Sequence, residues 1–450
     1  MTSVLNPDRF TARVSAAAEA ARPTVRGVVD EVRGLSIRVR GVSARVGDLV
    51  HIESRTGTTA EVVAVQDSGN GHEATCLPLG ALAGLAAGDR VTATGQPLTI
   101  PVGDGLLGRV LDGLGRPLDG TPLPAGLSRA TIDAVPPDAM TRARVDRPVP
   151  LGVRTIDTLM PVGRGQRMGI FAGSGVGKSS LLSMITRGTS ADVTVLALIG
   201  ERGREVREFL EDDLGPEGLQ RAVVVVATSD QPPMVRLRAA YVATRIAEWF
   251  RDAGRGVLLM MDSLTRLAIA QREIGLSAGE PPTTRGYPPS VFAMMPGLLE
   301  RAGASDRGSI TGIYTVLVEG DDHNEPIADT ARSILDGHVV LDRRLANAGH
   351  YPAIDVLQSV SRVANAITTP AQQQLALELR RLVAARADVQ ELVQIGAYVR
   401  GTNPTADHAL AVWPAIQHFL QQERHDLVPA DVAWAQLGEA LGAHSVGGLS

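Results

Sequence analysis

The sequence predicts an α/β protein whose core is a parallel β-sheet with helices on both faces, preceded by a small β-barrel and followed by a helical domain. Three patterns indicate this. Between residues 193 and 318, short apolar runs alternate with helical segments, as in βαβ units. Between residues 24 and 99 the apolar residues recur with period two, and from about residue 370 their spacing is helical. The predicted divisions of the chain are residues 1–22, 23–99, 100–368 and 369–450.

Residues 169–180 read Gly-Ile-Phe-Ala-Gly-Ser-Gly-Val-Gly-Lys-Ser-Ser and lead into a segment with one apolar helical face. The local order is therefore strand, glycine-rich loop and helix. Glycines let a loop wrap its N–H groups closely around phosphate oxygens, and the helix start adds a positive dipole end. Lys178 would neutralise the β and γ phosphates, and the Ser179 hydroxyl would be a Mg²⁺ ligand. The predicted phosphate-binding residues are Ala172, Gly173, Ser174, Gly175, Val176, Gly177, Lys178, Ser179 and Ser180.

The loop departs from the strict phosphate-loop pattern at one position. Ala172 stands where that pattern has its first glycine, and a small residue is all that the position needs. The alternative interpretation is a glycine turn before a surface helix. The strand-to-helix context of Gly177, Lys178 and Ser179 favours phosphate binding.

Composition excludes several classes of protein. The 450 residues include 44 Lys and Arg against 49 Asp and Glu, a net charge of −5, so no basic field indicates nucleic acid binding. The longest apolar runs, such as residues 222–227 and 257–261, are far shorter than the roughly 18 residues that span a bilayer. The single cysteine, Cys76, excludes an internal disulfide and a cysteine zinc cluster. We expect it to be a small buried residue in a reducing cytoplasm.

Residues 1–22 lack the apolar core of a secretory signal, but Phe10, Val14 and Ala17 lie at helical spacing among charged residues. We expect an amphipathic helix that could bind a partner or touch a membrane surface. A frayed terminal helix fits the same pattern.

Short strands separated by turn residues predict a small antiparallel barrel over residues 23–99. Such barrels can bind oligonucleotides, but aromatic residues for base stacking are absent between residues 24 and 99. An assembly role is therefore preferred. After the barrel, residues 101–144 are rich in glycine and proline, and residues 105–119 are predicted to form a helix and then a turn that link to the next domain.

Two predicted strands end in an acidic residue. The run 257–261 precedes Asp262, which would arrive beside the phosphate loop and hold Mg²⁺, because ligands bind at the carboxyl ends of parallel strands. The alternative is an aspartate that caps the next helix. The run 195–199 leads to Glu201, the best-placed carboxylate to polarise a water for attack on the γ phosphate. Alone, the Glu201-Arg202 pair would be an ordinary solvated surface feature.

Residues 352–361 read Pro-Ala-Ile-Asp-Val-Leu-Gln-Ser-Val-Ser and resemble the signature of the rotary ATPase α/β superfamily, which includes F-type and V-type catalytic subunits. The resemblance covers nearly the whole chain, with the phosphate loop, Glu201 and Asp262 in the family's order. It implies a RecA-like core in a homohexameric, Mg²⁺-dependent ATPase. Four segments are similar to the type III protein-export ATPases in particular: residues 171–179, 199–206, 318–326 and 331–337.

The resemblance also implies roles for single residues. Glu201 matches the catalytic carboxylate, and Arg202 is its neighbour in the site. Arg362 matches the arginine finger that reaches the γ phosphate of the next subunit, where it would stabilise charge in the transition state. Tyr351 matches the aromatic that stacks on adenine, and Phe419 is a candidate for the second aromatic of that pocket. The predicted catalytic residues are Lys178, Glu201, Arg202 and Arg362, and the predicted metal ligands are Ser179 and Asp262.

The export family has a flagellar and an injectisome branch, and Ser174 and Val176 favour the flagellar form. The resemblance implies a protein at the cytoplasmic face of the inner membrane that binds ATP, stator and stalk proteins, export chaperones and cargo, and no nucleic acid. Three rivals remain: an F-type β subunit, an RNA translocase and a noncatalytic nucleotide-binding subunit. The run 319–326 is unlike the first, the barrel lacks the aromatics of the second, and Glu201 disfavours the third.

Overall fold

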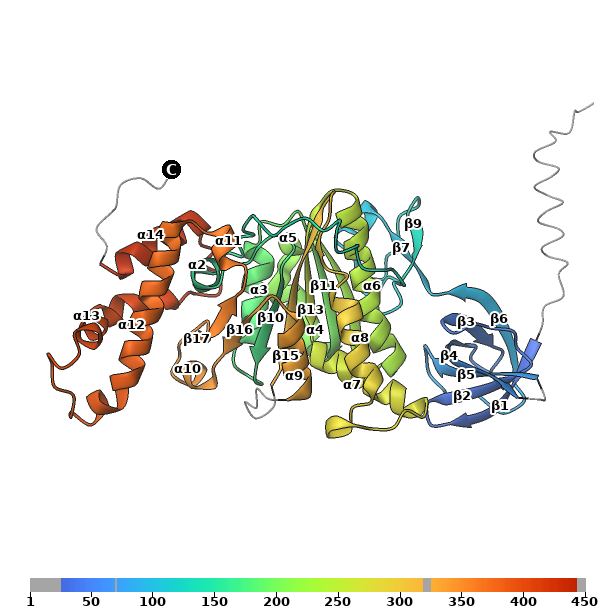
Figure 1. Cartoon of the computed structure of the whole chain (residues 1–450). Coiled ribbons are helices and arrows are strands. Elements are labelled where there is room, and N and C mark those ends of the chain that lie inside the picture. The colour runs from blue at the N-terminus through green and yellow to red at the C-terminus, as the bar shows by residue number, and fades with distance from the viewer. Residues whose placement is uncertain (1–25, 69–70, 319–324, 443–450) are drawn as a thin grey trace, which may run out of the picture. The chain divides into compact units, whose positions relative to one another are not determined.

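The computed structural model describes residues 26–68, 71–318 and 325–442 (Figure 1). The chain divides into two compact units between Leu98 and Thr99. The predicted helix over residues 1–22 lies outside the described residues, and so do residues 319–324 of the predicted export-ATPase segment. The described helices include none that is both long and apolar enough to cross a membrane.

The first unit is a closed antiparallel barrel, as the period-two pattern predicts. Buried and exposed residues alternate along its strands, so that one side chain in two points to the barrel core. Cys76 is fully buried in that core, as expected, and burial raises the pKa of its thiol to about 12. In barrel order the strands are β1 Arg26–Arg33, β2 Ser36–Arg40, β5 Gly71–Pro78, β4 Thr58–Ser68, β3 Asp48–Ile52 and β6 Arg90–Pro97.

The second unit is built around a mainly parallel sheet, which confirms the predicted α/β core. The edge strand β17 runs antiparallel to β16, and the short strand β14 (Gly303–Ala304) pairs with β15. A separate two-stranded sheet pairs β7 (Thr99–Val102) with β9 (Ser128–Thr131). Across the large sheet the strands are β17 Ile354–Ser361, β16 Gly337–Leu341, β10 Arg167–Ala172, β15 Ser309–Leu317, β13 Gly256–Asp262, β11 Val193–Glu201, β12 Ala222–Thr228 and β8 Val110–Asp112.

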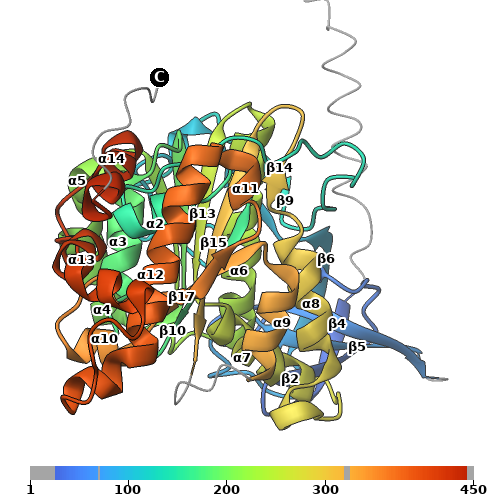
Figure 2. The ribbon, with the colours of Figure 1, turned by 60° about the vertical axis from the view of Figure 1, so that its left-hand side comes forward.

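Helices cover both faces of this sheet, because its central strands are apolar on both faces (Figure 2). Leu196 and Met260 share a core with helix α3 (Lys178–Gly188), whereas the alternate residues Ala197 and Met261 are buried outside that core cluster. The remaining helices around the sheet are α2 Arg154–Leu159, α4 Gly203–Glu208, the π-helix η2 Phe209–Leu214, α5 Gly215–Gln220, α6 Pro233–Asp252, α7 Leu264–Ser277, α8 Pro289–Leu299, α9 Pro326–Ile334 and α10 Arg343–Asn347, with 3₁₀ turns η1 Asp104–Leu106 and η3 Thr284–Gly286.

The structure corrects the predicted helix within residues 105–119. Only the short turn η1 forms there, and strand β8 follows and pairs with β12 at the sheet edge. Four glycines and Pro117 within these fifteen residues make a helix costly. A three-residue edge strand gives the backbone hydrogen-bond partners on β12 without forcing the glycines and Pro117 into a helix.

The C-terminal residues are helical as predicted: α11 Ala364–Ile367, α12 Pro370–Gln394, α13 Pro404–Leu420 and α14 Ala430–Ala440. Thr369 and Gln372 form a capping box at the start of α12, which explains its sharp beginning. Leu379, Ile416 and Leu437 of these helices belong to the same core cluster as the inner residues of the sheet. A separate domain over residues 369–450 therefore stays a sequence-based division.

A buried ion pair joins α6 to the segment that follows α8. Arg301 Nε and Nη2 lie 2.7 and 2.8 Å from the two carboxylate oxygens of Glu248, and the two side chains are only 2% and 1% exposed. Glu248 also accepts a hydrogen bond from Arg245 at 3.2 Å. The Arg301 guanidinium therefore depends on Glu248 more than Glu248 depends on it, because an unpaired charge at this depth is costly.

We expect Glu248→Ala to lower the free energy of unfolding by about 3–5 kcal/mol, because it leaves the Arg301 guanidinium buried without its partner. Urea titration followed by circular dichroism measures the loss. Glu378→Ala, which breaks the exposed pair with Arg381, is the matched control and should cost less than about 1 kcal/mol. Similar losses in the two variants would contradict the assignment.

Candidate active site

The glycine-rich loop joins the end of β10 to the start of α3, as the sequence predicts. Ala172 is the last residue of the strand, and Lys178 is the first of the helix. Gly175 and Gly177 have φ angles of 76° and 92°, in the left-handed region that favours glycine. The loop therefore turns sharply and presents the free N–H groups of the first helical turn at the carboxyl edge of the sheet.

Two strand-end acids meet the first residue of α3 at this edge. The Lys178 Nζ lies 2.5 Å from Asp262 Oδ1 and 3.6 Å from Glu201 Oε1. Asp262 ends β13 and Glu201 ends β11, and these two strands are parallel neighbours, so their last residues share one end of the sheet. The structure thus brings together three residues that are 23 to 84 positions apart in sequence.

Two further residues hold these acids, and the sequence analysis missed both. Arg266 donates from Nη1 to the Gly200 carbonyl oxygen at 2.5 Å, and its Nε lies 3.4 Å from Glu201 Oε1. Thr315 donates from Oγ1 to Asp262 Oδ1 at 2.6 Å. Arg266 could have been found as a basic residue one helical turn after the strand-end acid. Thr315 gives no such signal, because it is one threonine in a buried apolar strand.

Glu201 is a buried acid whose reactive oxygen is incompletely paired. Burial raises the pKa of Glu201, and the charge of Asp262 raises it further, while Lys178 and Arg266 oppose the shift. The rise prevails because burial is the largest of these effects. Among the described residues, no donor completes a hydrogen bond to Glu201 Oε1. This oxygen is therefore available to accept a proton from a water molecule.

The residues at this edge suit a Mg²⁺ ion that also binds phosphate and water, and not a metal whose ligands all come from the protein. Asp262 offers a buried carboxylate, and Ser179 is exposed in the first turn of α3. These are hard oxygen donors, which Mg²⁺ prefers, and it commonly completes its shell with phosphate and water. No cluster of three or more acids, histidines or cysteines suited to a metal occurs in residues 26–68, 71–318 and 325–442. Ser179 and Asp262 are thus the residues that could hold the ion.

Tyr351 lies beside the phosphate loop. A Cβ atom on Gly177 would sit 3.3 Å from the Tyr351 ring, so the ring packs directly over this glycine. The Tyr351 side chain is also 46% exposed, which leaves surface for another group to contact. The structure therefore places this aromatic within reach of a nucleotide held by the loop.

Arg202 and Phe419, which were also predicted to belong to the site, form no hydrogen bond or ion pair with the other predicted site residues that the structure describes. Arg202 is 65% exposed, and its Nη1 pairs with Glu205 Oε1 at 3.2 Å. Phe419 is only 2% exposed, in the core, with the Arg154 guanidinium 5.9 Å from its ring centre. In this structure Phe419 presents no open face to a base.

Arg362 lies at the opposite end of the sheet from the phosphate loop. It follows β17, whose last residue Ser361 pairs with Gly337 at the beginning of β16. Its N–H donates to Asp336 O, and the Asp336 N–H donates to the Arg167 carbonyl at the start of β10. The phosphate loop follows the other end of β10, about 17 Å along the strand at 3.3 Å per residue. Arg362 is exposed and too distant to serve its own loop.

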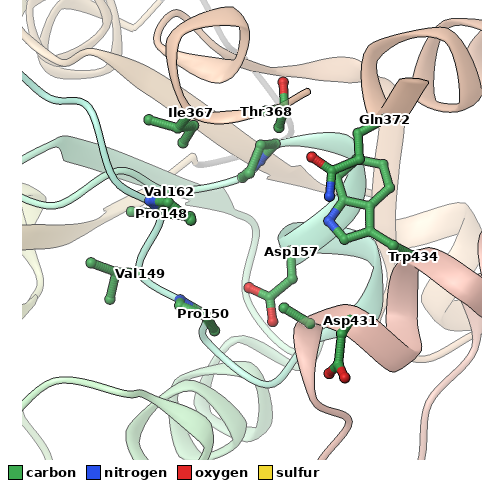
Figure 3. A pocket seen from close by; sticks show the side chains of 12 residues that line it. Pro148, Val149, Pro150, Asp157, Val162, Ile367, Thr368, Gln372, Asp431 and Trp434 are labelled. Atoms are coloured by element: carbon green, nitrogen blue, oxygen red, sulfur yellow. The ribbon is translucent and has the colours of Figure 1, made fainter. Parts of the chain in front are cut away.

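A separate cavity of about 210 Å³ lies between residues 148–162 and α14 (Figure 3). Trp434 and Asp157 line it, and no residue of the predicted site does. The Asp157 carboxylate accepts the N–H groups of Leu151 at 2.8 Å and Gly152 at 2.9 Å. Burial raises the pKa of Asp157 to about 7. This aspartate supports the loop that precedes α2.

Two family models match the second unit, one over its sheet and one over its C-terminal helices. Residues 152–361 match the nucleotide-binding domain of the ATP synthase alpha/beta family, and residues 368–439 match the C-terminal domain of the type III secretion ATPase EscN. The flagellum-specific ATP synthase of Bacillus subtilis is 54% identical over 381 residues, which cover 84% of this chain and 86% of that protein. The type 3 secretion system ATPase of Xanthomonas euvesicatoria is 53% identical over 404 residues, covering 89% and 90%.

A solved structure agrees with these sequence matches. The assembled ATPase EscN from the type III secretion system of enteropathogenic E. coli matches with a TM-score of 0.88 and 47% identity, over 92% of this chain and 100% of that one. The resemblance and the fold predicted from the sequence are confirmed. This chain therefore belongs to the ATP synthase alpha/beta family and, within it, to the type III protein-export ATPases.

Proposed function

We propose that this chain hydrolyses ATP with Mg²⁺ in a ring of six copies, and that this hydrolysis energises type III protein export. The observation that carries the proposal is the meeting of Lys178, Glu201 and Asp262 beside the phosphate loop. Membership of this family supports a nucleoside triphosphate as the substrate. The three groups are those that hydrolysis needs: a cation for the phosphates, an acid for the metal and an acid for the water.

The loop binds the triphosphate through its N–H groups, with the Lys178 ammonium on the β and γ phosphates. Ser179 and Asp262 would hold Mg²⁺, which would neutralise charge on the phosphate oxygens. Tyr351 stacks on the adenine. These contacts fix the γ phosphorus near Glu201 and exclude competing orientations.

Glu201 acts as the general base. Its Oε1, to which no hydrogen bond is completed among the described residues, accepts a proton as the water oxygen bonds to the γ phosphorus and the bond from that phosphorus to the bridging oxygen breaks. The raised pKa of Glu201 makes its carboxylate a better base than an exposed one. Arg266 keeps the carboxylate oriented through its contacts with Gly200 and Glu201.

Arg362 completes the site of a neighbouring copy. Because it lies at the far end of its own sheet, its guanidinium would approach the γ phosphate of the next protomer and stabilise the charge of the transition state. Arg202, beside Glu201 in sequence, would turn toward the phosphates when nucleotide is bound. A closed ring gives every copy such a neighbour.

The relatives suggest the partners of this ring. EscN has been solved assembled and also with its central stalk EscO. For this chain we propose a homohexamer that binds a stalk protein, a stator-like regulator, export chaperones and cargo, at the cytoplasmic face of the inner membrane. The flagellar branch stays a prediction, since the flagellar and injectisome relatives are 54% and 53% identical. Neighbouring genes for rod and hook proteins, or for needle proteins, would distinguish the branches.

We expect Glu201→Gln to lower kcat at least about 100-fold while the Kd for ATP changes little, because it removes the base but keeps the shape of the site. Lys178→Ala should weaken both binding and turnover. Phosphate release and calorimetric titration measure the two quantities. Glu208→Gln, an exposed change on the neighbouring helix α4, is the control. Wild-type turnover by Glu201→Gln would contradict the assignment of Glu201 as the general base.

Mixed rings of Lys178→Ala and Arg362→Ala copies should recover activity, although each variant alone should be at least about 100-fold slower. At equal mixing, about one quarter of the interfaces pair an intact loop with an intact arginine from its neighbour. We therefore expect about one quarter of the wild-type rate from co-expressed, doubly tagged rings. A rate no higher than that of either variant would place both residues in the site of one copy.

The acidic limb of the kcat/KM profile should lie above the ordinary glutamate pKa of about 4.3, because burial keeps Glu201 protonated to higher pH. Activity then falls as pH decreases through this raised pKa. Arg266→Gln removes a charge that lowers the pKa of Glu201, so it should move the limb to still higher pH. Rate measurements across pH check both shifts. A limb that Arg266→Gln leaves in place, or moves to lower pH, would argue against Glu201 as the base.

A further inference from the structure

Residues 421–426, the first part of the segment between α13 and α14, are named here the connector. It contacts both Tyr351 and the C-terminal end of α3. The Gln422 N–H donates to the Tyr351 carbonyl oxygen at 3.0 Å. The connector is therefore attached directly to the residue proposed to stack on adenine.

Gln422 also fixes the connector to the loop before α2. Its Nε2 donates to the Gly152 carbonyl oxygen at 2.8 Å, and its Oε1 accepts the Arg154 N–H at 2.8 Å. The Asp157 carboxylate accepts the Gly152 N–H at 2.9 Å. Gly152 packs against the last residue of α3, since a Cβ on it would lie 2.7 Å from Gly188 Cα.

Charged contacts fix the connector to the phosphate-loop helix and to the π-helix. Arg424 pairs with Asp213 of η2. Arg187, near the end of α3, donates from Nη2 to the Arg424 carbonyl oxygen at 2.5 Å, and its Nη1 lies 2.8 Å from His425 Nδ1. Ser183 of α3 donates to the Asp213 carbonyl oxygen at 3.1 Å. Burial and then the charge of Arg424 lower the pKa of Arg187, whose guanidinium is hydrogen-bonded to the Arg424 main chain.

The pair of Arg424 and Asp213 thus offsets a repulsion between neighbouring cations. Without the Asp213 carboxylate, Arg187 and Arg424 would face each other with their charges unbalanced. Without the Arg424 guanidinium, the connector would keep its contacts with Arg187 of α3 but lose its ion pair with η2. The π-helix itself is a rare element that is frequent at functional sites.

We propose that Arg424 and Asp213 are positioning residues for the adenosine half of the nucleotide. Their ion pair holds the connector, and through Gln422 the Tyr351 loop, at a fixed distance from the phosphate loop. This inference rests on the proposed function, because it assumes that Tyr351 contacts the base. A base and a triphosphate are bound together only when both subsites are held at matching separation.

The test compares two probes: a non-hydrolysable ATP analogue with Mg²⁺, and inorganic tripolyphosphate with Mg²⁺, which has no base. Base stacking on an aromatic contributes about 5- to 150-fold in affinity. We expect Arg424→Gln to raise the Kd of the ATP analogue about tenfold and to leave that of tripolyphosphate within about twofold. Asp213→Asn should weaken the analogue more, because it leaves two cations unbalanced. Isothermal titration calorimetry on the full chain measures both constants.

Two further variants keep the test decisive. Arg424→Lys retains the charge and should bind the analogue within about threefold of the wild type. The exchange Asp213→Arg with Arg424→Asp should recover most of the loss. Arg109→Ala breaks the partly exposed pair with Asp119 beside β8, at the far edge of the sheet, and is the control, expected to change neither Kd.

Three outcomes would each overturn the inference. Arg424→Gln could weaken both probes equally, or leave the affinity for the analogue unchanged. The exchange variant could fold and yet show no recovery. These outcomes differ from a failure of the proposed function. In that case the wild-type protein itself would bind neither the analogue nor tripolyphosphate.

Discussion

The charge balance between Lys178 and the acids Asp262 and Glu201 is the constraint on which the site depends. Two buried carboxylates at the end of one sheet would repel each other, and the ammonium between them offsets that repulsion. Thr315 and Arg266 complete the arrangement from neighbouring elements. In the proposed function a triphosphate competes for the same lysine. A divalent cation beside Asp262 would then take over the balance, which explains why nucleotide and Mg²⁺ would bind together.

Sheet topology decides which groups can cooperate within one copy. The parallel strands β10, β11 and β13 deliver their last residues to one edge, so the loop, Glu201 and Asp262 meet without any long connection. The antiparallel strand β17 runs the other way and ends at the opposite edge, where Arg362 follows it. One chain therefore carries a phosphate site and an arginine that cannot meet. In the proposed ring, each loop would receive the arginine of its neighbour.

The C-terminal helices are part of the same physical unit as the sheet. Their apolar residues share its core cluster, and the connector adds charged contacts to α3 and η2. A displacement at the phosphate loop would thus reach these helices through packed and paired side chains. In the proposed export function, that continuity provides a route by which nucleotide state could act on a partner bound to the helices.

The sequence by itself determined the fold class, the barrel, the strand-loop-helix around Lys178 and the strand-end positions of Glu201 and Asp262, because periodicity and glycine content are local properties of the chain. The helix predicted within residues 105–119 was wrong, because β8 pairs there with β12 at the edge of the sheet. Only the tertiary structure decided that Thr315 and Arg266 hold the acids, that Phe419 is buried and that Arg362 faces away from its own loop. Those facts depend on which distant segments are neighbours, and pairing between strands is a long-range contact that no local pattern encodes.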